Sequence, residues 1–303
     1  MANPNFHENK CKRLIAKGVQ PILRVLSKKL YVKWQYRYIT GHHLNLRKPL
    51  RYTEKLQYLR LYVFPNNTQV RQCTDRIAVR DYVNSKGLSG ILIPLIGEYQ
   101  RFEEIPWNNI PDAFALKCTH ACAFNLVTRE KAKVDYVKIK KEFRRFLKTN
   151  YGRKTVELHY SKIKPRLILE EHLSPLSNQL PIEYKIHVFN GKARYLYVVS
   201  GRNSDIRYDN LYIDWTPFPG AQFNHWRSSE YPPQKPANFE MMVDVAEKLA
   251  NPFPFCRVDL YNINGKIYFS EMTFTPAKGT LIFDDDQADF IIGKWLDLSN
   301  YIK

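Results

Sequence analysis

The chain of 303 residues carries 47 Lys and Arg against 29 Asp and Glu, a formal net charge of +18, with 44% apolar and 14% aromatic residues. This size and apolar content allow two or three lobes around a sizeable core, and the charge indicates an anionic partner such as nucleic acid, acidic glycan, nucleotide or anionic lipid. No apolar run approaches the ~20 residues of a membrane span, the start lacks the apolar core of a signal peptide, and five scattered cysteines without zinc spacing indicate reduced thiols in the cytoplasm.

Residues 8–39 form a strongly basic segment, with nine Lys or Arg, one acid and apolar residues at roughly helical spacing. We expect a basic amphipathic helical extension over residues 1–52, in which Pro21 ends or kinks one helix and starts another. Such a helix can bind an anionic membrane surface peripherally. Alternatively, its apolar stripe packs on the body of the protein, and the sequence leaves both readings open.

An N-terminal lobe is expected over residues 53–112. Two short helices are predicted over 53–64 and 74–86, the second closed by Gly87. Arg76 and Arg80 would lie one turn apart on the same face of that second helix. The face is either a binding site for an anion or an ordinary solvated basic surface.

A central lobe is expected over residues 113–182. The segment "AFALKC" (113–118) predicts a strand, and "THACAFN" predicts a loop of small residues that leads into the next strand. Residues 135–150 are typical of an amphipathic helix. The segment "PRLILEEHL" (165–173) predicts a strand that ends in acids.

A C-terminal lobe is expected over residues 183–303. It begins with a hairpin over 183–199 that turns at Asn190-Gly191, followed by a five-proline stretch over 217–236 that predicts a long ordered loop at the site. A helix over 238–249 precedes a second hairpin. The last helix is expected to be capped by Asp284, Asp285 and Asp286.

The second hairpin, "CRVDLYNINGKIYFSEMTFTPAKG", places two acids, Asp259 and Glu271, in otherwise apolar strands. A two-residue turn at Asn264-Gly265 would pair Asp259 with Ser270 and send the two acids to opposite faces. A three-residue loop over 263–265 instead pairs Asn262 with Lys266 and places Asp259 opposite Phe269. We predict this second register.

In that register Arg257, Asp259, Glu271 and Thr273 share one face of the hairpin. Two carboxylates on one face are costly to bury without a cation between them, and oxygen ligands at this spacing suit Mg²⁺. The alternative is an exposed hairpin with an Arg–Glu salt bridge of little energetic consequence.

The order of these elements resembles the ATP-grasp superfamily, specifically its teichuronopeptide-biosynthesis (TupA-like) branch, from about Glu54 to Leu298. The resemblance implies an α+β ATP-grasp fold in which ATP is sandwiched between two antiparallel-sheet lobes. The basic helical extension lies outside the resemblance.

The segment "SEMTFTPAKG" is similar to the closing motif of the superfamily, which holds Mg²⁺ and the transferring phosphoryl group. The resemblance implies Asp259, Glu271 and Thr273 as metal ligands and Arg257 as a catalytic residue. Thr273 replaces the usual Asn, so a second metal ion would be held less firmly.

The nucleotide-binding residues follow from the same resemblance. It implies Arg80 and Lys117 at the phosphates, with Lys117 also catalytic. It implies the adenine edge at Glu170, Glu171 and Leu173, ribose hydroxyls at Glu183, and a phosphate contact at Lys185. The loop over the triphosphate would comprise His120, Ala121, Cys122, Ala123, Phe124 and Asn125. Cys122 lacks an evident partner base and is not expected to act as a nucleophile.

The implied activity is that of an ATP-dependent carboxylate–amine ligase that forms an amide through an acyl phosphate. The TupA-like branch implies an amino acid joined to a uronic-acid carboxylate of a cell-surface polysaccharide or its precursor, and the +18 charge suits such an acidic glycan. A glycosyltransferase that uses Asp284 to Asp286, or a nucleotide-binding relative without turnover, remains an alternative. No RNA-binding, zinc or helix-turn-helix signature is present, and no nucleic-acid partner is expected.

Overall fold

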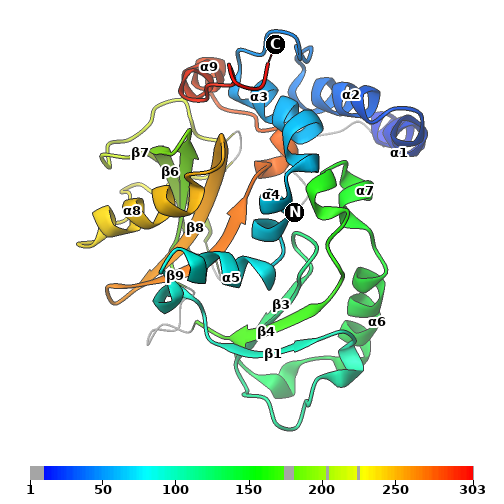
Figure 1. Ribbon diagram of the computed structural model, residues 1–303, viewed down its shortest axis with the longest axis vertical. Coiled ribbons are helices and arrows are strands. Elements are labelled where there is room, and N and C mark those ends of the chain that lie inside the picture. The colour runs from blue at the N-terminus through cyan, green and yellow to red at the C-terminus, as the bar shows by residue number, and fades with distance from the viewer. Residues whose placement is uncertain (1–9, 174–180, 203–204, 224–225, 303) are drawn as a thin grey trace.

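The computed structural model describes residues 10–173, 181–202, 205–223 and 226–302, and the side chains from Gly18 onward. Figure 1 shows two β-sheets with helices on their outer sides and at the junction between them, and a pair of helices projecting from one flank. The sheets have four and five strands, and every pairing within them is antiparallel. This is the expected α+β arrangement of two antiparallel-sheet lobes.

The smaller sheet has the strand order β1-β4-β2-β3. Its central strands carry the apolar runs that the sequence marked as strands, and Phe114, Leu116, Leu167 and Leu169 are buried. Helix α6 begins at the Asp135 N-cap and packs Ile139 and Phe143 into the same core. The elements are β1 (Leu95–Tyr99), β2 (Phe114–Cys118), β3 (Asn125–Thr128), α6 (Tyr136–Leu147), α7 (Tyr151–Thr155) and β4 (Leu167–Glu171).

The larger sheet has the strand order β7-β6-β5-β8-β9 and encloses most of the core. Helix α8 packs on β5, β6 and β8, where Ile186, Val258 and Leu260 are fully buried. Because side chains alternate along a strand, Lys185, Asp259 and their neighbours lie on the opposite face. The elements are β5 (Glu183–Phe189), β6 (Lys192–Ser200), β7 (Arg207–Tyr212), α8 (Phe239–Ala250), β8 (Phe255–Ile263), β9 (Lys266–Thr273) and α9 (Asp286–Trp295).

The basic extension forms two helices, α1 (Lys10–Leu26) and α2 (Lys28–Thr40). The predicted interruption at Pro21 is wrong: α1 continues through this residue, and the break comes at Ser27, whose hydroxyl caps α2. Helix α2 buries Tyr31, Val32 and Tyr36 against the body of the protein. A fully buried arginine, Arg60, joins the extension to the rest of the chain, because its guanidinium donates to Gln35, to Gln57, and to the carbonyls of Thr155, Val156 and Lys278.

The region expected as a separate lobe, residues 53–112, contributes to both sheets. Helices α3 (Tyr52–Tyr58), α4 (Thr68–Thr74) and α5 (Ala78–Ser85) pack into the core of the larger sheet, whereas β1 pairs with β4 in the smaller one. The helix predicted over 74–86 is present as α5, but its predicted start is wrong because the helix begins at Ala78. The chain breaks after Thr74, and Arg76 lies in the turn before α5 rather than one helical turn from Arg80.

The hairpin that carries the two acids has a different register from the predicted one. Ile263 pairs with Lys266 across a two-residue turn at Asn264-Gly265, where both residues have positive φ, so the predicted three-residue loop is wrong. A β-bulge then inserts Ser270 into β9, and Asp259 pairs with Glu271 instead of with Ser270. The bulge restores the shared face, and the prediction that Arg257, Asp259, Glu271 and Thr273 lie together is confirmed.

Candidate functional site

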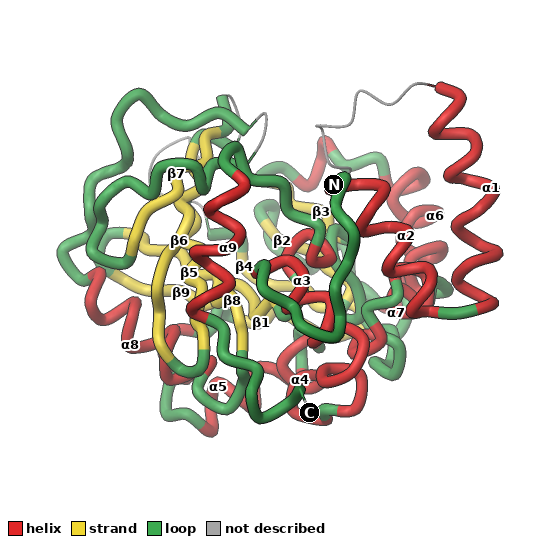
Figure 2. The backbone as a smooth tube through the Cα atoms, turned by 90° about the horizontal axis from the view of Figure 1, so that it is seen from above, coloured by secondary structure: helices red, strands yellow, loops and turns green. Residues whose placement is uncertain are grey.

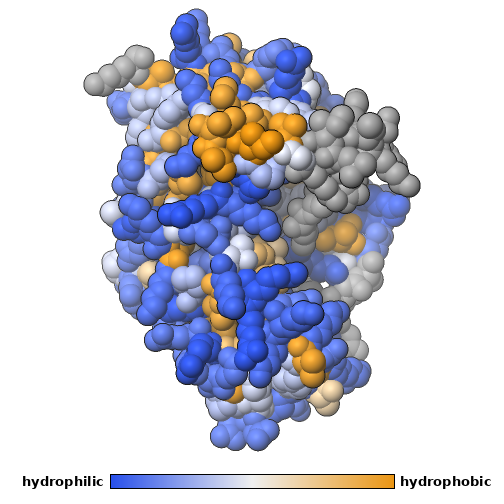
Figure 3. Space-filling model, turned by 90° about the vertical axis from the view of Figure 1, so that its right-hand side faces the viewer, coloured by the Kyte–Doolittle hydropathy of each residue, from blue (hydrophilic) through white to orange (hydrophobic). Residues whose placement is uncertain are grey.

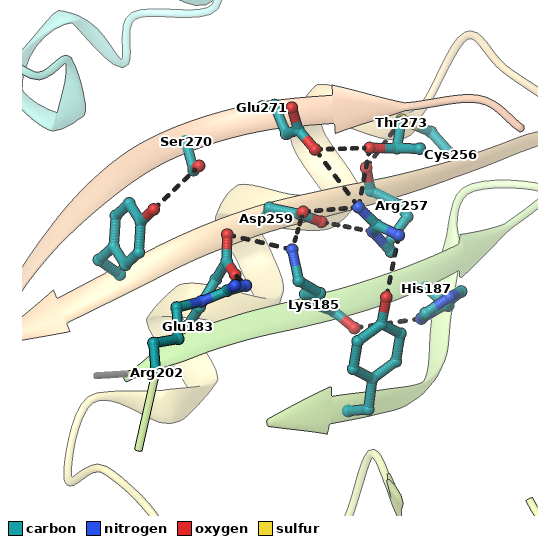
Figure 4. Close-up of polar contacts among 12 residues, drawn as sticks. Glu183, Lys185, His187, Arg202, Cys256, Arg257, Asp259, Ser270, Glu271 and Thr273 are labelled. Atoms are coloured by element: carbon teal, nitrogen blue, oxygen red, sulfur yellow. Dashed lines mark hydrogen bonds and ion pairs between the residues drawn. The ribbon is translucent and has the colours of Figure 1, made fainter. Parts of the chain in front are cut away.

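The polar face of the larger sheet is built from alternate residues of three neighbouring strands. Lys185 on β5 pairs with Asp259 on β8, and Asp259 in turn pairs with Glu271 on β9. Figure 4 shows these side chains converging, with Arg257 between Asp259, Glu271 and Thr273. Five strands packed on a common core fix these positions, so the polar groups are held by a rigid part of the fold.

Asp259 lies at the centre of this face and is fully buried. Arg257 donates two hydrogen bonds to it, from Nε to Oδ1 at 2.6 Å and from Nη2 to Oδ2 at 2.7 Å. Lys185 Nζ also donates to Oδ2. Burial lowers the pKa of Lys185, but the carboxylates of Asp259 and Glu183 outweigh it and raise that pKa above its ordinary value. Lys185 is therefore a fixed positive charge beside the carboxylates.

Glu271 is the more accessible of the two acids, with 29% of its side chain exposed. Arg76 Nη2 donates to Oε2 at 2.9 Å, while Thr273 Oγ1 lies 3.2 Å and Arg257 Nη2 lies 3.4 Å from Oε1. Burial raises the pKa of Glu271, but the charges of Arg76, Lys185 and Arg257 more than offset it and bring the pKa to about 2. The carboxylate is therefore ionised at neutral pH.

Two further side chains hold this face in place. Tyr197 on β6 accepts a hydrogen bond from Arg257 Nη1 at 3.0 Å, and Phe223 from the proline-rich stretch packs edge-on against the tyrosine ring. Arg202 donates to Glu183, which also contacts Lys185 Nζ at 3.0 Å. The described part of the proline-rich loop thus supports the site through Tyr197.

A second charged group is formed by Lys117 and Glu170 of the smaller sheet together with Arg80 of α5. Lys117 Nζ lies 2.7 Å from one oxygen of Glu170, and Arg80 Nη1 lies 3.3 Å from the other. Arg80 also donates to the carbonyl of Ile93 at 3.0 Å. Two cations with one carboxylate leave a net positive charge at this position.

The small-residue loop between β2 and β3 spans Thr119 to Phe124. Ala123 adopts a φ of 63°, so an alanine here takes the left-handed conformation that glycine adopts more easily. His120 is buried beneath the loop, where its Nε2 lies 3.1 Å from the carbonyl of Phe146, and Phe124 stacks on the ring of Phe146. Burial lowers the pKa of His120, so its ring is neutral and supports the loop.

The other residues expected at the nucleotide belong to the small-residue loop and to the end of β4. Cys122 is exposed, and Asn125 pairs with Lys117 across β2 and β3. The backbone N–H of Glu171 donates to the carbonyl of Pro94 at 3.0 Å, and Leu173 is half-buried where β4 ends. The predicted segment therefore lies at the end of the strand that carries Glu170.

A cleft joins the two charged groups. It is lined by Arg76, Arg80, Glu170 and Glu271, with Ala121 and Tyr160 among its other walls. Arg76 spans it, because its backbone N–H donates to Thr119 O beyond β2 while its guanidinium binds Glu271 on β9. The structure thus brings together Arg80, Lys117, Glu170 and Glu271, which the sequence had placed in one site from distant segments.

Sequence reasoning did not assign Arg76, Tyr197 and Arg202 to the site. Tyr197 pairs with Lys185 across the first hairpin, so the hairpin register alone could have placed it on the polar face. Arg76 was expected on one helical face with Arg80 but lies in the turn before α5, and Arg202 lies in a connecting segment for which the sequence gives no signal.

The donors on β8 and β9 fit Mg²⁺ in their chemistry. Asp259, Glu271 and Thr273 are hard oxygen donors on one face, and Mg²⁺ is commonly bound by one or two carboxylates together with substrate phosphates. Within the described ranges, no group of three or more His, Cys, Asp or Glu side chains could hold a metal ion. The protein would therefore provide two carboxylates and a hydroxyl, and the substrate would complete the coordination.

The acids of the terminal helix have other roles. Asp285 Oδ1 caps α9 by accepting from the N–H of Gln287 at 2.9 Å, as expected, and Asp286 pairs with Arg51 and with His42. These contacts engage two of the three acids that a glycosyltransferase site would require.

Comparisons with solved structures return ligases and synthetases at low identity. An L-amino acid ligase from Bacillus licheniformis is 12% identical over 70% of this chain and 45% of that chain, with a TM-score of 0.43. An N5-carboxyaminoimidazole ribonucleotide synthetase solved as its ADP complex is 15% identical over 73% and 50%, with a TM-score of 0.42. A D-alanine–D-alanine ligase from Helicobacter pylori is 14% identical over 81% and 69%, with a TM-score of 0.43. The chain thus spans about half the length of the first two of these proteins.

Two further comparisons use the sequence alone, and one of them identifies the family. No curated protein matches the chain. The profile of the TupA-like ATP-grasp family matches residues 54–297, which include all strands of the described residues and both charged groups of the cleft. The chain therefore belongs to the TupA-like ATP-grasp family.

Proposed function

We propose that this protein is an ATP-dependent ligase that joins a carboxylate to an amine through an acyl phosphate. The observation that carries the proposal is the guanidinium of Arg257 held between Asp259 and Glu271, on a face whose cleft also contains Arg80 and Glu170. An ATP-grasp chain with this arrangement has cations for a triphosphate on one side and oxygen donors for a metal ion on the other.

ATP would bind in the cleft between the two sheets. Lys117 and Arg80 would bind phosphate oxygens, which requires them to exchange part of their contact with Glu170 for the nucleotide. The backbone from Glu170 to Leu173 would contact the adenine edge, and Glu183 would accept from ribose hydroxyls. The loop over residues 120–125 would cover the triphosphate and exclude water from the acyl phosphate.

Mg²⁺ would be held by Asp259, Glu271 and the hydroxyl of Thr273, which requires the two carboxylates to exchange part of their contacts with Lys185, Arg257 and Arg76 for the ion. When bound, the ion would offset negative charge between the β- and γ-phosphates. The positive charges of Arg76 and Arg257 lower the pKa of Glu271, so this carboxylate is already ionised before a metal ion binds.

The chemistry consists of two displacements. A carboxylate oxygen of the acceptor attacks the γ-phosphorus, the bond to the β-phosphate oxygen breaks, and ADP leaves. An amine then attacks the acyl carbon, loses a proton, and displaces inorganic phosphate to form the amide. Arg257, rigidly oriented by Asp259 and Tyr197, would stabilise the negative charge that develops on oxygen in both steps.

The acceptor class is proposed from charge and family. A net charge of +18 favours an acidic acceptor, and the TupA-like family indicates the uronic-acid carboxylate of a cell-surface glycan or its precursor, joined to an amino acid. None of the described helices has the length and apolarity to cross a membrane.

The proposal is tested by measuring ADP release with Mg-ATP, a panel of uronic-acid acceptors and the common amino acids. ADP release that requires both an acceptor and an amino acid, with amide product seen by mass spectrometry, is the expected result. Release of UDP from a sugar nucleotide without ADP from ATP would contradict it. A rise in melting temperature with Mg-ATP but no turnover with any acceptor would identify a nucleotide-binding protein without ligase activity.

A further inference from the structure

The corner where α1 meets α2 exposes four large apolar side chains. Val25 is 88% exposed, Leu26 72%, Ile22 61% and Leu30 53%. Helix α2 buries Tyr31, Val32 and Tyr36 against the body of the protein, and Leu23 of α1 packs against this cluster. Packing on the body therefore accounts for one side of the helix pair, whereas the corner itself remains in contact with solvent.

Basic residues surround this corner, and residues 18–40 contain no acid. The side chains of Lys28, Lys29 and Lys33 are exposed beside the apolar group. Arg24 is directed the other way, because its Nη1 donates to the carbonyl of Lys154 at the end of α7. The corner is thereby fixed to the neighbouring helix.

The basic surface continues beyond the corner. Helices α1, α2, α6 and α7 lie on one side of the molecule in both views of the backbone. Figure 3 shows this side, with a hydrophobic patch in its upper part and hydrophilic surface below. Over residues 136–164, the exposed cations are Lys138, Lys141, Arg144, Arg145, Lys148, Arg153, Lys154, Lys162 and Lys164. The only acids in that range are Glu142 and the buried Glu157.

We propose that the α1–α2 corner is a docking surface for an anionic lipid bilayer. Ile22, Val25, Leu26 and Leu30 would enter the boundary between headgroups and acyl chains, while the surrounding lysines bind anionic headgroups. The surface rests on these observations alone and does not depend on the ligase activity. Docking here would hold the enzyme beside acceptors that are themselves anchored in the membrane.

Charge distinguishes the bilayer from other occupants. A second copy of the chain would bring Lys28, Lys29 and Lys33 against the same cations on its partner. A nucleic acid would satisfy the lysines, but phosphate contacts do not bury four aliphatic side chains. A bilayer with anionic headgroups is complementary to both the charged and the apolar parts of the corner.

Co-sedimentation of the full chain with vesicles, without nucleotide, tests this assignment. We expect binding to phosphatidylcholine vesicles that contain phosphatidylglycerol, and much weaker binding to phosphatidylcholine alone. Val25→Ser/Leu26→Ser should weaken binding about tenfold or more, because membrane affinity scales with the apolar area inserted. Lys28→Gln/Lys29→Gln should weaken it about 30-fold, since each cation near an anionic surface contributes ~1 kcal/mol. Met241→Ser is the matched control, since this apolar residue is 59% exposed on α8, at the other side of the molecule.

Three results would overturn the proposal. One is vesicle binding by Val25→Ser/Leu26→Ser equal to that of Met241→Ser. Another is a concentration-dependent dimer in lipid-free buffer that disappears in the same double variant. The third is absence of vesicle binding together with salt-sensitive binding of a DNA duplex. Because each readout uses no ATP, these results are independent of any failure to detect ligase activity.

Discussion

Asp259 and Glu271 would share a metal ion, yet the structure predicts very different costs for removing their charges. Asp259 is fully buried and accepts hydrogen bonds from Arg257 and Lys185. Asp259→Asn keeps the shape of the side chain but removes the carboxylate shared by two buried cations, which leaves Lys185 with Glu183 and Arg257 with the more distant Glu271. Removing one partner of such a buried pair costs about 3–5 kcal/mol.

Glu271 is 29% exposed, and solvent reaches it beside Arg76. Glu271→Gln leaves Arg76 partly hydrated, so we expect a loss of about 1 kcal/mol or less, as for partly exposed ion pairs. Both variants should lose ADP release, because each removes a proposed metal ligand. Activity and stability should therefore separate for Glu271 and fall together for Asp259.

Urea-induced unfolding at pH 7, followed by tryptophan fluorescence, measures the difference. Asp259→Asn should unfold at a clearly lower urea concentration, and the double variant Asp259→Asn/Lys185→Met should recover a large part of the loss because it also removes one stranded cation. Asp284→Asn, a change at an exposed acid outside the site, should match the wild type in both stability and activity. Wild-type stability of Asp259→Asn, or no recovery in the double variant, would refute the charge-balance reasoning.

Three further changes test other parts of the structure. Lys117→Ala should weaken ATP binding about tenfold or more in a calorimetric titration with little change in melting temperature, since Arg80 still pairs with Glu170; an unfolded variant would instead show that Lys117 is structural. His159 is buried, and burial together with the charge of Arg60 lowers its pKa to about 3. Below about pH 6.5 this histidine gains a proton only in the unfolded chain. The free energy of unfolding should therefore fall by ~1.4 kcal/mol per pH unit below that pH. In urea titrations from pH 5 to 8, the free energy of unfolding of His159→Phe should fall less steeply in acid than that of the wild type. Parallel curves of this free energy against pH for the two proteins would contradict the prediction. Burial raises the pKa of Asp289 to about 6 despite its hydrogen bonds from Thr53. The contribution of Asp289 to the free energy of unfolding is therefore greatest in acid and is lost as the pH rises from about 4 through 6. Asp289→Asn keeps the bond from the Thr53 N–H, and its amide nitrogen can instead donate to Thr53 Oγ1. This variant should become more stable than the wild type by up to ~3 kcal/mol at pH 7; an equal or less stable variant would refute the assignment.

Local patterns predicted most of the strands because each carries its own apolar periodicity. The hairpin turn at Asn190-Gly191 and the strand over 165–173 appear as β5–β6 and β4. Helix α6 and its Asp135 cap also follow from residues within one segment. Errors occur where local signals compete, as at Pro21, whose surrounding residues support the helix in spite of the proline, and after Thr74.

The two acids show where sequence reasoning fails even when its conclusion holds. The two-residue turn at Asn264-Gly265 by itself would place Asp259 and Glu271 on opposite faces, and only the bulge at Ser270 reunites them. A bulge has no strong sequence signature, because it depends on how β9 packs against its neighbours. The shared face was predicted correctly from an incorrect register.

The sequence by itself determined the strands, the turns and the closing acidic motif, because these are local patterns, and its resemblance to the TupA-like ATP-grasp family implied the two antiparallel lobes. Only the tertiary structure decided that Arg76 crosses the cleft to Glu271, that Lys185 is bound to Asp259, and that one corner of the basic helices stays exposed. Arg76 and Glu271 are 195 positions apart in the sequence, and Lys185 and Asp259 are 74 positions apart. The packing of whole sheets and helices brings such distant partners together.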